Sequence, residues 1–323
     1  MRVTNSMLSK SFLRDLNRNQ NNLKKINNQL SSGKEISRPS DNPYKAARSM
    51  QLSSDIKAAI QYNENIKDTT NWLDTTDTAL QQLEKSFQRI RELMVSAGNA
   101  AYGSDEKKAI KDEINEKVNE IAQILNTNFD GKYIFGGTKV NSKPVAVQAD
   151  GTTGNNKLYY SSSDGTIIAD PSTSNEMEML ASGLIVEISQ GVTMKYNVSS
   201  TEILEFGEGA NKVNVMNLLT DITNSLDSED SSEVTGNLLS QMDSTISNLL
   251  KIMSEVGAKQ NRMEAAATQN EDQILNLKDV LSKTEDIDFA EKTIEASVAQ
   301  TVYMASLQVS ARIIQPTLLD FLR

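Results

Sequence analysis

Two long stretches of this chain carry apolar residues at alternating intervals of three and four positions, and this pattern constrains the fold more than any other feature. In the first stretch, the pattern has one polar member and otherwise apolar ones: Leu73, Thr76, Leu80, Leu83, Phe87, Ile90, Met94 and Ala97. Such spacing is typical of the seam of a coiled coil or of a bundle helix. The stretch is therefore predicted to form one long helix with a single buried side.

The second stretch repeats the pattern from Leu239 to Leu281, and only Gln260 and Asn270 are polar in it. Polar residues in a seam can fix the register of two helices, or this part of the seam can simply be partly exposed. Both interpretations stay open from the sequence. A helix of this length would run roughly 60 Å, which is too long for a compact globule to cover. An elongated helical rod is the expected result.

Between these stretches the sequence changes character. Ten of the 15 glycines fall between Gly131 and Gly209, whereas each glycine inside a helix would cost about 1 kcal/mol. Short β-prone runs occur at 158–160, 166–168 and 183–188, and they are separated or flanked by the turn pairs Asp150-Gly151, Asp164-Gly165 and Gln190-Gly191. These signals predict a small β-rich domain inserted between two helical arms.

A further helix is predicted between the first stretch and this region. Gly98 and Gly103 interrupt the apolar pattern, and Ser104 is a suitable N-cap because Asp105 and Glu106 follow it in the first turn. The buried side of this helix is predicted to carry Ile110, Ile114, Ile121 and Leu125.

Both ends of the chain carry apolar residues that one copy has few neighbours to cover. Near the C-terminus, a first stripe comprises Ile294, Val298, Val302, Ala305, Val309 and Ile313, and a second stripe comprises Met304, Leu307, Ala311, Ile314 and Leu318. A helix with two stripes must be buried on several sides, so packing between subunits is expected. The predicted assembly interface comprises Leu16, Leu23, Ile26, Leu30, Ile294, Val298, Val302, Leu307, Val309, Ile314, Leu318 and Leu322.

The composition excludes most chemistry. The chain contains no His and no Cys, so cysteine nucleophiles, histidine bases and most zinc sites are impossible. Its 33 basic and 43 acidic residues argue against nucleic acid or a membrane surface as partner. The acidic group Glu285, Asp286 and Asp288 is interpreted as helix capping rather than a cation site. No catalytic residue, cofactor or metal is predicted, and the chain is expected not to be an enzyme.

Two segments carry a family resemblance. Residues 30–43, which read LSSGKEISRPSDNP, resemble the signature that follows the first helix of flagellin-family proteins, and residues 305–322 resemble their C-terminal helix. The Pro-Ser-Asp-Asn-Pro form at 39–43, the segment 131–138 and the closing 319–322 are more similar to hook–filament junction members of the family than to filament flagellins. The resemblance covers both flanks and leaves the β-rich region unmatched.

The resemblance implies a mainly α fold, an elongated hairpin-like helical rod or bundle with long coiled-coil-like N- and C-terminal helices and one inserted small β-rich domain. Residues 1–42 and 285–323 would form the inner assembly core. Residues 43–138 and 207–284 would form the helical rod, and residues 139–206 the β-rich outer domain.

The function that the resemblance implies is structural, as an adaptor at the hook–filament junction on which flagellin polymerises. The implied partners are the hook-side junction protein, flagellin, further copies of the chain in a ring, the flagellar export apparatus and an export chaperone. The N-terminus lacks a cleavable secretory signal, and family members reach the extracellular flagellum through the flagellar type III route. Two alternatives stay open: filament flagellin itself, or a flagellin scaffold with an adhesive or enzymatic central domain.

Overall fold

The computed structural model describes residues 5–98, 103–151, 154–168, 175–207, 209, 212–227 and 232–319, although the side chains of 5, 6, 8, 232, 233 and 312–319 are outside the description. Its contacts divide the chain into two compact units. The first unit comprises Met1–Ile60 and Asp272–Arg323, and the second comprises Gln61–Glu271. The boundaries between the units fall inside two long helices, α2 (Pro43–Ala97) and α8 (Asn237–Glu285), so each unit contains part of both helices.

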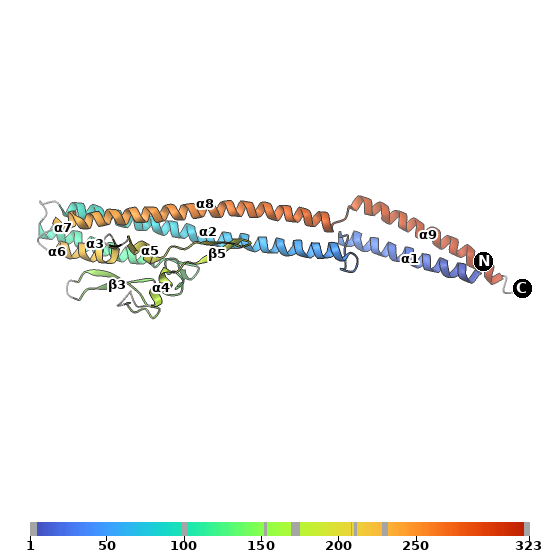
Figure 1. Ribbon diagram of the computed structural model, residues 1–323, viewed down its shortest axis with the longest axis horizontal. Helices are drawn as coiled ribbons and strands as arrows, with labels where there is room; N and C mark the ends of the chain where they lie inside the picture. The colour runs from blue at the N-terminus through green and yellow to red at the C-terminus, as the bar shows by residue number, and fades with distance from the viewer. Residues whose placement is uncertain are drawn as a thin grey trace. The chain divides into compact units, whose positions relative to one another are not determined.

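The chain is mainly helical, with its longest helices towards the two ends of the sequence (Figure 1). The long helices are α1 (Asn5–Ser32), α2 (Pro43–Ala97), α3 (Ser104–Leu125), α6 (Val215–Asp227), α8 (Asn237–Glu285) and α9 (Phe289–Leu319). The short ones are α4 (Asn175–Ala181), α5 (Ser200–Leu204) and α7 (Ser232–Thr235). Within the described residues, no helix is both long and apolar enough to cross a membrane.

The predicted seams of α2 and α8 are confirmed in the second unit. Every seam residue from Leu73 to Ala97 is fully buried, including the polar Thr76, whose hydroxyl donates to the Trp72 carbonyl at 2.8 Å. On α8, every seam position from Leu239 to Asn270 is buried or half-buried. Two cross-helix hydrogen bonds, Gln260 to Asp74 at 2.8 Å and Asn270 to Asn63 at 3.1 Å, show that the helices run antiparallel.

Helix α3 has the predicted buried side, but its N-cap lies one residue earlier than expected. Gly103 occupies the cap, and its backbone N–H donates to the Glu106 carboxylate at 3.0 Å. The sequence favoured Ser104 because serine is the better capping residue, but here the carboxylate three positions after the cap satisfies the free N–H. Ile114, Ile121 and Leu125 are fully buried.

Among the residues that the structure describes, the strands form four separate antiparallel pairs within the second unit. The pairs are β1 (Asn128–Phe129) with β2 (Lys132–Tyr133), β3 (Val145–Ala149) with β4 (Asn156–Tyr160), β5 (Ile185–Ser189) with β6 (Val192–Lys195), and β7 (Glu205–Phe206) with β8 (Val213–Asn214). The predicted run 166–168 is not a strand, since only Ile167 forms a single bridge, to Ser161. Strand β3 packs on α3, and β4 packs on both α3 and α6; Val145 on β3 and Tyr160 on β4 are buried.

Candidate assembly surface

In the first unit, α1 and α9 lie side by side as an antiparallel pair (Figure 1). The Asn19 amide donates to the Ser306 hydroxyl at 3.4 Å, and Gly33 at the end of α1 packs near the ring of Phe289 at the start of α9. Asp288 caps α9 by accepting from the backbone N–H groups of Ala290 and Glu291 at 2.9 and 3.2 Å. The capping interpretation of Asp288 is therefore confirmed.

The predicted residues of α1 lie in its seam. Ile26 is 2% exposed, and Leu16, Leu23 and Leu30 are half-buried. Phe12 and Asn19 continue the same alternation of three and four positions. Because this seam is covered by α9 of the same chain, the expectation that the terminal apolar residues have few neighbours within one copy is wrong for α1.

The face that α9 turns towards α1 consists mostly of small residues. Its half-buried positions are Lys292, Ala296, Ala299, Tyr303, Ser306 and Ser310, which again alternate by four and three. This face was not predicted from the sequence, because the prediction rested on the large apolar side chains. The regular recurrence of Ala and Ser at seam spacing was the signal that could have revealed it, since small residues allow close approach of two helices.

The large apolar side chains of α9 remain exposed on this helix. The exposed fractions are 67% for Ile294, 57% for Val298, 46% for Val302, 43% for Leu307 and 49% for Val309. Ile314 and Leu318 belong to α9, but their side chains are outside the description, and Leu322 lies beyond the described residues. Contiguous exposed apolar residues on a helix typically mark a contact surface.

Glu285 at the end of α8 contacts both α2 and the loop that follows α1. Its carboxylate forms an ion pair with Lys34 and accepts from the Ser49 hydroxyl at 2.8 Å. Its carbonyl accepts from the Glu35 N–H at 2.6 Å. Glu285 thus connects α8, α2 and the loop after α1. In the part of the chain that the structure describes, no cluster of three acidic residues could hold a metal ion.

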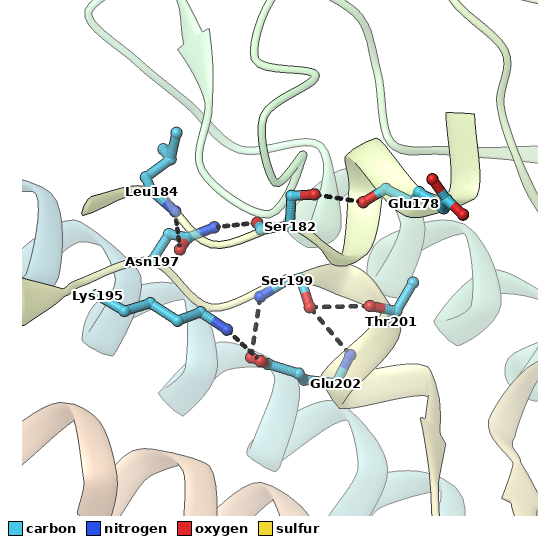
Figure 2. A network of polar contacts seen from close by, with 8 residues as sticks. All are labelled: Glu178, Ser182, Leu184, Lys195, Asn197, Ser199, Thr201 and Glu202. Atoms are coloured by element: carbon cyan, nitrogen blue, oxygen red, sulfur yellow. Dashed lines mark hydrogen bonds and ion pairs between the residues drawn. The ribbon is translucent and has the colours of Figure 1, made fainter. Parts of the chain in front are cut away.

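A polar network of the β-rich region stabilises local structure (Figure 2). Ser199 is fully buried and caps α5, because its hydroxyl accepts from the Glu202 N–H at 3.3 Å while Glu202 accepts from the Ser199 N–H at 3.2 Å. Lys195 donates to the Glu202 carboxylate at 2.7 Å. A serine without access to solvent and already engaged as a cap is unsuited to act as a nucleophile.

Two further groups complete this network. The Asn197 side chain accepts from the Leu184 N–H at 2.7 Å and donates to the Ser182 carbonyl at 3.2 Å, so it substitutes for a strand partner (Figure 2). Burial lowers the pKa of Lys259 on α8, which lies near Glu202 and Lys195. The Lys195–Glu202 ion pair attaches the β5–β6 hairpin to α5, and the Asn248 side chain of α8 donates to the Glu202 carbonyl at 3.1 Å.

Comparison with known proteins places these helices in a family. Residues 3–140 match the bacterial flagellin N-terminal helical region, and residues 239–322 match the bacterial flagellin C-terminal helical region. Flagellar hook-associated protein 3 of Escherichia coli is 22% identical over 316 residues, which cover 95% of both chains. The flagellin of Clostridium tyrobutyricum is 31% identical over 141 residues, which cover 43% of this chain and 37% of that flagellin.

Solved structures extend the likeness to the fold. A flagellar hook-associated protein from Vibrio parahaemolyticus superimposes with a TM-score of 0.61, at 21% identity, and covers 76% of this chain and 100% of its own. The two matched regions of the sequence together span more than half of its length and include α1, α2, α3, α8 and α9. The chain therefore belongs to the bacterial flagellin family.

Proposed function

We propose that this chain is a structural adaptor of the bacterial flagellum at the hook–filament junction, on which flagellin polymerises. The observation that carries the proposal is the similarity to hook-associated protein 3 over 95% of both chains. The similarity to Clostridium flagellin, in contrast, covers only 37% of that protein. A filament flagellin is therefore the less favoured alternative.

The two faces of α9 have different environments, and this difference supports a role in assembly. The small-residue face is used within the chain, against α1, whereas Ile294, Val298 and Val302 remain exposed. Exposed apolar side chains on a terminal helix are unfavourable in water unless another chain covers them. In this proposal they contact neighbouring copies in a ring, the hook-side junction protein and flagellin.

The remaining parts of the proposal follow from the same role. The chain would act outside the cell, after export through the flagellar type III route with an export chaperone among its partners. It would need no catalytic site, and the buried Ser199 network offers none. Residues 1–42 with 285–323 would form the inner core, residues 43–138 with 207–284 the rod, and residues 139–206 the outer domain.

A single substitution tests the assembly surface. Val302 belongs to the first stripe and is 46% exposed, so Val302→Asp should leave the isolated protein folded. In an assembly the new carboxylate would be buried without a partner, which costs about 3 kcal/mol or more, a factor of more than 100 in affinity. Electron microscopy of cells that carry only this variant should show bare hooks. Unpolymerised flagellin should be found in the culture medium.

The matched control is Gln308→Asp. Gln308 is exposed on the same helix, but it lies between the two stripes, so the same charge should leave filaments intact. The presence of filaments on cells with Val302→Asp would contradict the proposal that this face of α9 is an assembly surface. Deletion of 141–201 is a weaker test, because it removes buried residues such as Val145 and Tyr160 that pack on α3 and α6.

A further inference from the structure

An open cleft of about 630 Å³ in the second unit lies between α2, the β1–β2 turn and the β5–β6 hairpin. Its interior is aromatic. The Trp72 indole meets the ring of Phe129 edge to face at 6.1 Å between centroids and 85°, and the ring of Tyr196 at 5.8 Å and 87°. Trp72 is only 6% exposed, whereas Phe129 and Tyr196 are half-buried. The proposed assembly surface on α9 uses none of these residues.

Each wall of the cleft is held in place by local structure. Asp130 and Gly131 form a two-residue hairpin turn with φ angles of 51° and 77°, typical of a type I′ turn. The turn is closed by a hydrogen bond from the Gly131 N–H to the Asn128 side chain at 2.9 Å. On the opposite side, the Asn65 amide donates to the Glu187 carbonyl of β5 at 3.3 Å. The cleft is therefore preformed.

The rim carries unpaired charge. Asp68 on α2 and Asp130 on the turn line the cleft and are exposed, and neither forms an ion pair or accepts a hydrogen bond among the described residues. Lys132 is the one basic side chain among the lining residues described. Ile185, 69% exposed on β5, adds an apolar surface beside them.

We propose that this cleft binds an arginine side chain presented by another protein. Two carboxylates against one ammonium group leave an excess of negative charge, which favours a cation. A guanidinium can donate to a rim carboxylate and stack on the exposed part of an aromatic ring, while its aliphatic stem packs on apolar lining such as Ile185. A neutral sugar ring would gain nothing from the excess negative charge of the rim, which therefore favours the cation.

The test titrates the full-length protein with a blocked tripeptide, Gly-Arg-Gly, and follows the indole N–H signal by nuclear magnetic resonance. Trp72 is the only tryptophan of the chain, so isotope-labelled tryptophan gives one signal. Trp72 lines the cleft, so a ligand bound there should change this signal. The arginine peptide should shift this signal saturably, with a dissociation constant of about 1 mM for so small a ligand.

The matched ligand replaces arginine by citrulline, which has the same shape and no charge, and should cause no saturable shift. Two exposed substitutions then test the charges in opposite directions. Asp68→Asn should weaken arginine binding about tenfold, because it removes a charge-assisted hydrogen bond. Lys132→Gln should strengthen it, because it removes a like charge.

Three outcomes would overturn the proposal: no shift with the arginine peptide, equal shifts with both peptides, or weaker binding in Lys132→Gln. Equal shifts would indicate a neutral ligand, and weaker binding in Lys132→Gln would indicate an anionic one. The measurement uses the isolated chain in solution, so its result is independent of whether the chain joins hook to filament.

Discussion

Two polar residues in an otherwise apolar seam illustrate what single side chains contribute here. Asn270 is only 4% exposed and donates to Asn63 across the helix pair, and Gln260 donates to Asp74. A buried amide without a partner would cost free energy, so these pairs penalise any other register of α2 against α8. Of the two interpretations left open by the sequence, register fixing fits the buried Asn270. Gln260 fits both interpretations, because it forms a cross-helix hydrogen bond and is also half-exposed.

Gly137 is a residue whose identity the backbone requires. Its φ angle is 61°, and a Cβ atom there would come closer to the Met179 and Leu180 carbonyl oxygens than real contacts allow. Gly137→Ala should therefore lower the free energy of unfolding by about 3 kcal/mol, from left-handed strain plus displacement of the α4 backbone. Urea unfolding of the variant measures this change.

Gly191 is the matched control for that substitution. Its φ angle is 75°, but nothing lies within 4 Å of its added Cβ atom. Gly191→Ala should cost only the backbone strain, about 1–2 kcal/mol. If both variants lost the same free energy of unfolding, the close approach of α4 would contribute nothing to the cost of Gly137→Ala.

At the scale of helices, adjacent residues of α8 provide a sharp comparison. Leu249 is 1% exposed in the seam, whereas Leu250 is 49% exposed. Leu249→Asp should lower the free energy of unfolding by about 4 kcal/mol or more, because it buries an unpaired charge and removes core contacts. Leu250→Asp should change it by less than about 0.5 kcal/mol. Thermal or urea unfolding of both variants decides whether the seam register is correct.

The helices were predictable because their pattern is local and repeated. The seams from Leu73 to Ala97 and from Leu239 to Asn270 needed only the spacing of apolar residues. Strand pairing was less accessible, since β-propensity depends on a partner strand: the run 166–168 is β-prone, yet only Ile167 bridges another residue. The inner face of α9 was missed for a different reason, because alanine and serine give little hydrophobic signal even where they pack against another helix.

At the scale of the whole chain, the two units differ in how much apolar surface they bury. One continuous hydrophobic cluster of the second unit extends from Ile66 to Met263. In the first unit, the buried apolar side chains among the described residues are Ile26, Ala46, Ile56, Ala59 and Ile274. Two of these are alanines, and the α1–α9 pair itself contributes only Ile26.

This difference predicts an order of opening. Because α1 and α9 bury little apolar surface against each other, they should separate at a lower free energy than the second unit unfolds. Native-state hydrogen exchange on the dilute monomer should show weak protection in α1 and α9 and strong protection in α3 and in the central part of α8. Equal protection in α9 and α8 would contradict the prediction.

A truncated chain makes that prediction specific to the contact between the two helices. Removal of residues 289–323 deletes α9 and leaves the α1 seam around Leu23 and Ile26 without its cover. The amides of α1 should then exchange as fast as those of an unfolded peptide, because an isolated helix of this composition is marginal in water. Protection in α3 should stay unchanged, since its buried side packs on α6, β3 and β4 within the second unit. If α1 kept its protection after the deletion, the seam with α9 would not be what holds it, and α1 would be stable for another reason.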